Sequence, residues 1–259
     1  MIPLKDYPGQ RRRFPFVTYL LILINIAVFL LELNQGATTP QFICAYSLVP
    51  EALTHNMPQT ALCASQFGQP FPYQVPSPVW LTIFTSMFMH AGWLHIGGNM
   101  LFLYIFGDNV EDRLGHVGYL IFYLFCGTVA ALAQVAVDPN SAIPSLGASG
   151  AIAGVLAAYL VFFPGTRVTT LIFLGIFITL TSLPALILIG VWFALQLFDG
   201  VAALSSQSDQ AMGGVAYFAH IGGFTAGLLI ALLLRPLLRR PAPRTRTYPR
   251  WPTSPGNRW

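Results

Sequence analysis

Six long apolar runs constrain this sequence more than any other feature. They cover residues 14–33, 92–110, 118–137, 147–163, 184–198 and 215–234. A helix needs about 20 mostly apolar residues to cross a bilayer, so each run is a candidate span. Only 8% of the residues are charged, whereas soluble domains have about 25%. The sequence therefore predicts an all-α membrane protein with six transmembrane helices.

Two apolar stretches do not fit a simple count of spans. Residues 168–198 are apolar throughout, which is too long for one span. Pro184 divides this stretch, and proline suits the first turn of a helix, so we expect the fifth span to begin near Pro184 after an interfacial loop. Residues 79–91 are too few to span the bilayer, and we expect them to lie in the interface or to re-enter the membrane.

The positions of the basic residues support six spans. With this count both termini lie on one side, and so do the connections that contain Arg113 and Arg167. Every Lys and Arg then falls on one face, as the positive-inside rule requires. A seventh span at 168–180 would move the arginine-rich tail to the opposite face, so we exclude it. We therefore expect both termini in the cytoplasm.

These observations divide the chain into three parts. They are a cytoplasmic N-terminal segment at 1–13, a six-helix membrane domain at 14–234 and a basic cytoplasmic tail at 235–259. The first run is longer than a signal peptide needs and no small-residue cleavage site follows it, so we expect a retained anchor. The tail has no folded module behind it, so we expect it to contact anionic lipids rather than nucleic acid. The short termini and compact loops favour a bacterial inner membrane.

Ser149 is the first polar residue that stands out, because polar groups inside lipid are costly. It lies in Gly147-Ala148-Ser149-Gly150 at the start of the fourth run. A lone serine there can simply cap the helix, and the glycines can simply allow close packing. The same position surrounds the hydroxyl with unpaired N–H groups and the positive end of the helix dipole, which would stabilise an oxyanion. Ser149 is therefore a candidate nucleophile.

His220 lies near the start of the sixth run. A single histidine in a membrane often only bonds to a neighbouring helix. Here the fourth and sixth runs begin on the same side, and Ser149 and His220 differ in depth by roughly one helical turn. A neutral imidazole in that place can take the serine proton. Gly223 and Gly227 form a G-x-x-x-G pattern that favours close packing of this helix.

His95 and Asn99 form the third polar group. They are four residues apart in the second run, so they share one helix face. Both side chains can donate a hydrogen bond, as an oxyanion hole requires, although an interhelical polar contact is an equal alternative. His90 lies off that face, and no carboxylate or thiolate is close in sequence. We therefore expect no metal and no other cofactor.

Three runs thus place polar groups near one depth, on the side that faces away from the cytoplasm, which is typical of a site. Acidic residues near that side, Asp138 and Asp199, lie at run ends or in loops. The pattern predicts a Ser–His dyad rather than a triad. Cys44 and Cys63 share one polar loop, where a disulfide on an oxidising side and two reduced thiols are equally compatible with the sequence.

Taken together with their order along the chain, the motifs resemble those of the rhomboid family of intramembrane proteases. The resemblance covers roughly residues 14–234. The matching elements are the G-x-S-G nucleophile motif at 147–150, the catalytic-histidine helix at 219–227, the H-x-x-x-N oxyanion element at 95–99, and the motif closing the second span at Gly107, Glu111 and Gly115.

The resemblance implies a six-helix fold and hydrolysis of peptide bonds in transmembrane segments of substrate proteins, within the lipid bilayer. It implies that Ser149 attacks the carbonyl carbon, while His220 acts first as base and then as acid. It also implies that His95, Asn99 and the backbone N–H of Ser149 hold the oxyanion. The active site would face the outer side of the membrane.

The sequence departs from the family pattern in two places. Many relatives have a Trp-Arg pair in the first loop, whereas here Trp80 precedes a leucine. Some relatives stack a tyrosine on the histidine, four residues after the nucleophile, but that position is Ala153, so another group must support His220. The resemblance places Trp192 and Gln196 near a substrate gate between the second and fifth spans.

Two other classes of protein remain as alternatives. A catalytically silent rhomboid-like protein would bind transmembrane clients without cutting them, but silent members generally lose the serine or the histidine. A transporter or channel would need charges along a path, and the outer halves of the spans have almost none. The expected partners are transmembrane substrates and lipid. The sequence does not determine the oligomeric state.

Overall fold

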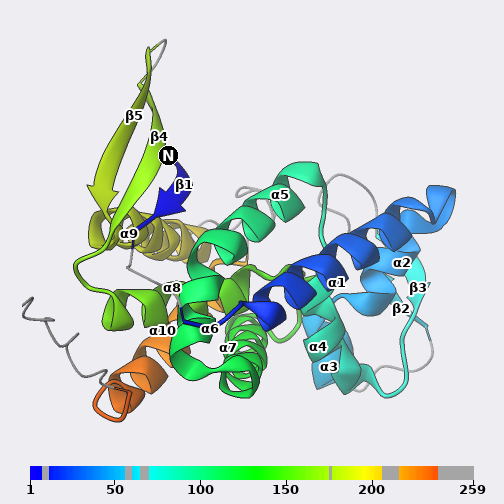
Figure 1. Ribbon diagram of the computed structural model, residues 1–259. Helices are drawn as coiled ribbons and strands as arrows, with labels where there is room; N and C mark the ends of the chain where they lie inside the picture. The colour runs from blue at the N-terminus through cyan, green and yellow to red at the C-terminus, as the bar shows by residue number, and fades with distance from the viewer. Residues whose placement is uncertain (8–11, 56–59, 65–69, 175–176, 206–215, 239–259) are drawn as a thin grey trace, which may run out of the picture.

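The fold is predominantly helical in the computed structural model (Figure 1). The residues that the structure describes are 1–7, 12–55, 60–64, 70–174, 177–205 and 216–238. The long helices are α1 (Phe16–Leu33), α7 (His116–Val137), α8 (Ser149–Phe162), α9 (Ala185–Ser205) and α10 (Tyr217–Leu234). Most of the predicted basic tail, residues 239–259, lies outside the described residues.

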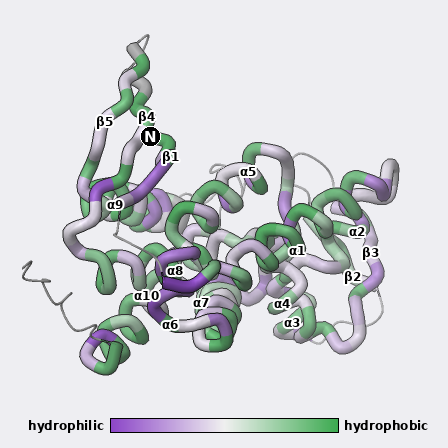
Figure 2. Tube along the Cα trace, in the orientation of Figure 1, coloured by the Kyte–Doolittle hydropathy of each residue, from purple (hydrophilic) through white to green (hydrophobic). Residues whose placement is uncertain are grey.

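Within the described part of the chain, four helices are long and apolar enough to cross a membrane, namely α1, α7, α9 and α10. Figure 2 shows apolar residues along these helices. Large side chains such as Leu23 and Leu233 remain exposed on them, as expected where a helix faces lipid. The start of α9 at Ala185 agrees with the break predicted at Pro184.

The second and fourth predicted spans differ from simple spanning helices. Helix α8 has 14 residues, or about 21 Å, and nearly all of them are buried among neighbouring helices. The second span is divided into α5 (Trp93–Phe102), a π-helical turn η4 (Leu103–Gly107) and α6 (Asp108–Leu114). The count of six spans and the side on which the termini lie therefore stay predictions.

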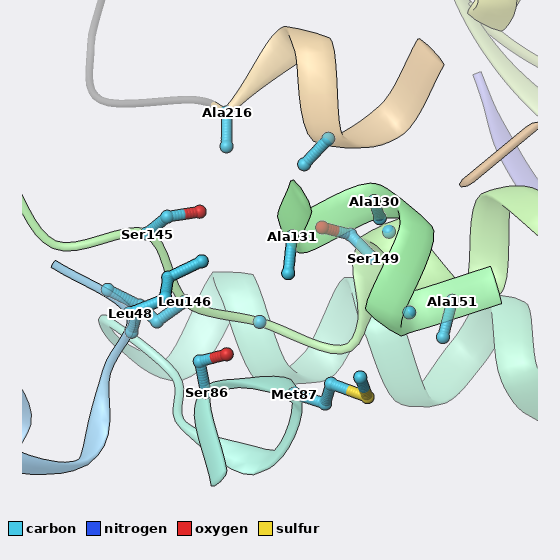
Figure 3. Close-up of a pocket in the computed structure, with 14 residues that line it drawn as sticks. Leu48, Ser86, Met87, Ala130, Ala131, Ser145, Leu146, Ser149, Ala151 and Ala216 are labelled. Carbon is cyan, nitrogen blue, oxygen red and sulfur yellow. The ribbon is translucent and has the colours of Figure 1, made fainter. Parts of the chain in front are cut away.

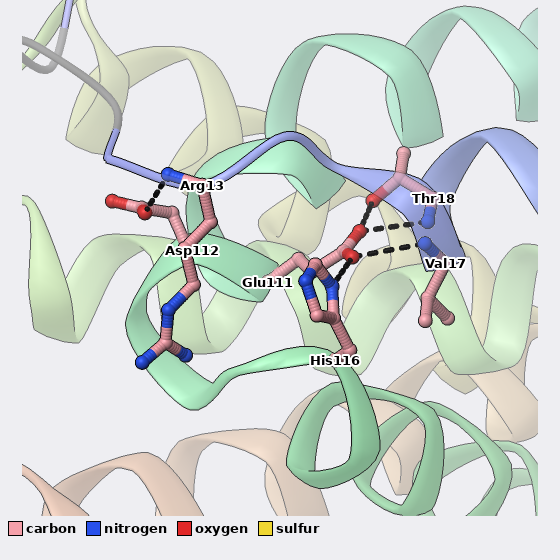
Figure 4. A network of polar contacts seen from close by, with 6 residues as sticks. All are labelled: Arg13, Val17, Thr18, Glu111, Asp112 and His116. Atoms are coloured by element: carbon pink, nitrogen blue, oxygen red, sulfur yellow. Dashed lines mark hydrogen bonds and ion pairs between the residues drawn. The ribbon is translucent and has the colours of Figure 1, made fainter.

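Glu111 on α6 holds the start of α1 in place (Figure 4). Its carboxylate accepts hydrogen bonds from the backbone N–H groups of Val17 and Thr18, at 2.9 and 2.7 Å, and from the Thr18 hydroxyl at 2.7 Å. The first N–H groups of a helix have no partner within the helix, and the dipole favours a negative charge there. His116 Nδ1 lies 2.5 Å from the same carboxylate. One buried acid thus joins α1 to the turn between α6 and α7.

The prediction of an all-α protein holds for most of the chain, but the structure also contains two small sheets. Strands β1 (Ile2–Asp6), β4 (Arg167–Leu174) and β5 (Phe177–Pro184) form an antiparallel sheet in the order β1-β4-β5. The expected interfacial loop before Pro184 is therefore a β-hairpin, which projects from the helices beside α9 (Figure 1). Its residues are rich in threonine, isoleucine and phenylalanine, and these favour strands.

The loop between α1 and the second span forms a small folded unit. It contains α2 (Thr39–Tyr46), α3 (Pro50–Thr54) and the paired strands β2 (Thr60–Cys63) and β3 (Phe71–Gln74). A disulfide joins Cys44 on α2 to Cys63 on β2, which decides between the two states that the sequence left open. Leu48 exchanges two backbone hydrogen bonds with Ser145, so this unit is tied to the segment that precedes α8.

Residues 79–91 form short helical pieces rather than a span, as their length predicts. They are η2 (Val79–Leu81), α4 (Thr82–Thr85) and η3 (Ser86–Phe88). Thr82, Ser86 and Met87 are buried, so this segment packs into the protein. The carbonyl of Ser86 accepts a hydrogen bond of 2.8 Å from the N–H of Gly147, which fixes the approach to α8.

Helices α8 and α10 approach each other through glycines. A Cβ on Gly223 would overlap the carbonyl group of Gly150, and one on Gly227 would overlap the backbone of Gly154. No side chain separates the two helices at these points, so their backbones are in direct contact. This contact sets the distance between the N-terminal ends of α8 and α10, where Ser149 and His220 lie.

Candidate active site

Ser149 is the first residue of α8, and the turn before it depends on a glycine. Gly147 has φ of +123°, a conformation that side chains other than glycine rarely adopt. A Cβ at this position would also lie 2.8 Å from Nε2 of His95. The N–H groups of the first turn of α8 have no partner within the helix. The serine hydroxyl therefore lies beside a helix N-terminus with a histidine ring close by.

His220 lies in the first turn of α10 and contacts Ser149 directly. Its Nε2 is 2.7 Å from Oγ of Ser149, which is the distance of a hydrogen bond. Its Nδ1 is 2.6 Å from Oε1 of Gln196 on α9. The ring is buried, with 8% of the residue exposed. Both ring nitrogens are thus engaged, one by the candidate nucleophile and the other by a neutral amide.

Trp192 and Gln196 support the imidazole that Ala153 cannot support. The Trp192 and His220 rings have centroids 5.6 Å apart and are tilted by 45°. The two α9 residues are four apart and so share one helix face. The structure places both residues against His220, and their position near a substrate gate stays a prediction. A polar residue on the face of an apolar run that carries Trp192 was the signal available in the sequence.

His95 and Asn99 lie on α5, and the His95 ring lies beside Gly147, two residues before the nucleophile. Nδ1 of His95 accepts a hydrogen bond of 3.3 Å from the backbone N–H of Ala91. In a neutral ring the remaining nitrogen, Nε2, then carries the proton, and this atom is the one beside Gly147. Nδ2 of Asn99 is buried and has no hydrogen-bond partner among the described residues. Each residue therefore has a donor available.

His90 contacts His95 without forming a metal site. The two ring centroids are 5.1 Å apart, in an edge-to-face arrangement. In the described part of the chain, no group of three or more His, Cys, Asp or Glu side chains is placed to hold a metal ion. The backbone N–H of His90 donates to the carboxylate of Glu32, at 3.1 Å, which ties this segment to α1.

A small cavity adjoins Ser149 (Figure 3). Its volume is about 30 Å³, and glycine and alanine residues supply much of its wall. Leu48, Ser86 and Met87 lie around it as well, so the disulfide-containing loop and the short helical segment both contribute. A space of this size holds about one water molecule beside the hydroxyl.

The fold and the site define a helical membrane protein that brings a serine and a histidine into hydrogen-bonding contact. The sequence model of the Rhomboid domain matches residues 77–237. The chain belongs to the rhomboid family.

Relatives in this family carry different descriptions. The chain is 30% identical to Rhomboid-like protein 11, chloroplastic, of Arabidopsis thaliana, over 61% of the chain and 53% of that protein. It is 28% identical to Rhomboid protease GluP of Bacillus subtilis, over 84% of the chain and 35% of that protein. It is 29% identical to Rhomboid protein 1, mitochondrial, of Saccharomyces cerevisiae, over 58% of the chain and 40% of that protein. The chain thus spans about a third to a half of these relatives' lengths.

Proposed function

We propose that the chain is an intramembrane serine endopeptidase that cleaves transmembrane segments of other membrane proteins with a Ser149–His220 dyad. The observation that carries this proposal is the 2.7 Å contact between Nε2 of His220 and Oγ of Ser149. A serine is a weak nucleophile by itself, and an adjacent base within hydrogen-bonding reach activates it. Membership in a family that includes a protein named Rhomboid protease GluP supports the same reaction.

In the first half of the reaction, Oγ of Ser149 attacks the carbonyl carbon of the substrate while Nε2 of His220 takes the hydroxyl proton. The carbonyl oxygen becomes an oxyanion in the tetrahedral intermediate. His220 then gives its proton to the leaving amine as the C–N bond breaks. The product left on the enzyme is an ester of Ser149.

The oxyanion needs donors that are already in place. The backbone N–H of Ser149 lies at the start of α8, where helix geometry leaves it without a partner within the helix. The candidate side-chain donors are Nε2–H of His95, which lies beside Gly147, and Nδ2–H of Asn99, which has no partner among the described residues. Donors that are positioned before the charge develops are worth more than donors that must reorient. In this proposal the three groups, from α5 and α8, donate hydrogen bonds to the same oxygen.

The second half of the reaction requires water. A water molecule in the cavity beside Ser149 would lose a proton to Nε2 of His220 and attack the ester carbonyl carbon. The serine oxygen leaves and takes back the proton from His220. The cavity has room for about one water molecule, and Ser86 and Ser145 line it beside Ser149 and the apolar side chains.

The test is cleavage of a labelled transmembrane substrate in detergent, with the wild-type protein beside Ser149→Ala. We expect wild type to cleave and Ser149→Ala to lose on the order of 10⁶-fold in kcat, the effect of removing the nucleophile of a serine protease. A fluorophosphonate probe should label wild type at Ser149 and leave the variant unlabelled. Equal cleavage by both proteins would disprove the assignment. Binding of the substrate without cleavage or labelling would instead indicate a silent client-binding protein.

A further inference from the structure

His220 has a partner that a two-residue mechanism does not use. Its Nδ1 lies 2.6 Å from Oε1 of Gln196, and its Nε2 lies 2.7 Å from Oγ of Ser149. The three residues stand on α9, α10 and α8 and form one hydrogen-bonded row. We propose that Gln196 is a positioning residue that sets the tautomer and the orientation of His220. This inference rests on the protease function proposed above.

The position of one proton distinguishes the two neutral tautomers of His220. An amide oxygen has no hydrogen to donate, so a hydrogen bond between Oε1 and Nδ1 requires the proton to be on Nδ1. A neutral imidazole has only one N–H, so Nε2 then carries the lone pair. Nε2 is the atom that faces the Ser149 hydroxyl. Gln196 thereby selects the one neutral tautomer in which His220 can accept the serine proton.

The opposite arrangement of the amide would inactivate the site. If the NH₂ group of Gln196 faced Nδ1, that nitrogen would have to accept, and the ring proton would move to Nε2. Nε2 would then donate toward Ser149 and have no lone pair for its proton. The observed oxygen-inward arrangement is therefore the productive one.

Gln196 continues to act after the proton has moved. The imidazolium ring has protons on both nitrogens, and Nδ1–H still donates to Oε1. The partial negative charge of the amide oxygen stabilises this cation, although less than a carboxylate would. Trp192, one turn earlier on α9, contacts the same ring from the side. One face of α9 thus holds the His220 ring through two contacts, the hydrogen bond from Nδ1 to Gln196 and the aromatic contact with Trp192.

A neutral amide suits this place better than an acid. An isolated carboxylate inside a membrane protein is costly to bury, and such groups tend to take up a proton. A protonated acid would donate to Nδ1 and enforce the wrong tautomer. Gln196 is partly exposed on a helix that faces lipid along much of its length. The amide supplies an acceptor without a charge that must be buried.

The first experiment compares Gln196→Met with Leu195→Met. Methionine keeps the length of glutamine and removes the strong acceptor, while Leu195 is exposed on the same helix and serves as the control. We expect kcat of Gln196→Met to fall on the order of 10²-fold with KM little changed, since positioned acid–base catalysis contributes about 10²–10⁴-fold. Leu195→Met should keep wild-type kinetics. A kcat of Gln196→Met within threefold of wild type overturns the inference.

The second variant, Gln196→Glu, separates positioning from packing. The ionised carboxylate accepts from Nδ1–H as the amide oxygen does, whereas its protonated form donates to Nδ1. We therefore expect activity of this variant to be recovered as pH rises, in a titration that wild type lacks. A purely structural role for Gln196 would add no such titration. A pH profile identical to that of wild type contradicts the proposal.

Nitrogen NMR of ¹⁵N-histidine-labelled protein tests the tautomer without any substrate. We expect an Nδ1-protonated His220 in wild type, assigned by its loss in His220→Ala, and a changed tautomer signal in Gln196→Met. This signal together with no cleavage by wild type would retain the positioning role and reject the protease. Cleavage by wild type, with an unaltered signal and unaltered kcat in Gln196→Met, would retain the protease and reject the positioning role.

Discussion

The α8–α10 pair and helix α9 meet at the same histidine but are built in opposite ways. The pair is in backbone contact at Gly150 and Gly223, with no room for a methyl group. In α9, by contrast, 22% of the residues from Ala185 to Ala202 are buried, the smallest share among the four described helices that are long and apolar enough to cross a membrane. The pair fixes where the serine and the histidine lie, and α9 supplies the groups that orient the ring. Packing of α8 against α10 thus sets the distance between Ser149 and His220. The hydrogen bond to Gln196 on α9 sets which nitrogen of His220 carries the proton.

Gly223→Ala should have the largest effect, because it disrupts the close packing that distinguishes the α8–α10 pair from α9. Its Cβ would overlap the Gly150 carbonyl, which is backbone and cannot rotate away. Separating α8 from α10 should destabilise the protein by about 3 kcal/mol, at the upper end of overpacking costs, and move His220 from Ser149. We expect cleavage to fall by more than 10²-fold, together with a lower unfolding temperature in detergent. Wild-type stability and activity would show that the helices are free to separate without penalty.

Asn99→Ala tests the contribution of α5, the third helix that carries candidate site residues. The substitution removes one buried donor whose Nδ2 has no partner in the described structure. Loss of one oxyanion donor costs roughly 3 kcal/mol of transition-state stabilisation, or 10²–10³-fold in kcat. The unfolding temperature should remain near that of wild type. Equal kcat for Asn99→Ala and wild type would exclude Asn99 from the oxyanion site.

Trp192→Leu probes the second contact that α9 makes with His220. The aromatic contact contributes about 0.5–1.5 kcal/mol beyond its buried area, which corresponds to a decrease of up to roughly tenfold in kcat. The effect should be smaller than that of Gln196→Met, because the hydrogen bond to Nδ1 remains. Steady-state kinetics on one substrate, with both variants measured side by side, decide the order. A larger loss in Trp192→Leu would make the ring contact the main support.

Gly190→Ala on α9 is the matched counterpart of Gly223→Ala. A Cβ at Gly190 meets no atom within 4 Å. Alanine loses less conformational freedom than glycine in a helix, so we expect a gain of about 0.5–1 kcal/mol in stability. Cleavage should be unchanged. A loss of stability comparable to that of Gly223→Ala would show that α9 is packed as closely as the α8–α10 pair.

The sequence revealed much of the site because polar residues are rare in its apolar runs. Ser149, His220, His95 and Asn99 stood out for that reason, and the structure brings the first two into contact and places His95 beside Gly147. Gln196 was polar too, but its role depends on the rotation of α9 about its own axis. Periodicity alone does not give that rotation relative to a neighbouring helix.

The strands were missed for a different reason. Residues 168–183 are mostly apolar or β-branched, and apolar and polar positions alternate only over the short stretch 178–181, so their pattern resembled an interfacial loop before a span. The pairing of β1 with β4 joins segments more than 160 residues apart, and no local signal reports it. The disulfide could likewise not be chosen from spacing, because it depends on the fold of the loop that brings Cys44 to Cys63.

The disulfide also bears on the side of the membrane at which a substrate would be cut. Such bonds persist in oxidising compartments, so the disulfide is consistent with the predicted position of the Cys44–Cys63 loop on the side of the membrane away from the cytoplasm. The same loop reaches the entrance to α8 through Leu48 and Ser145. A client cut at Ser149 would therefore be severed near that surface, and its outer portion would leave as a shed ectodomain. The remaining portion of the client would stay in the lipid.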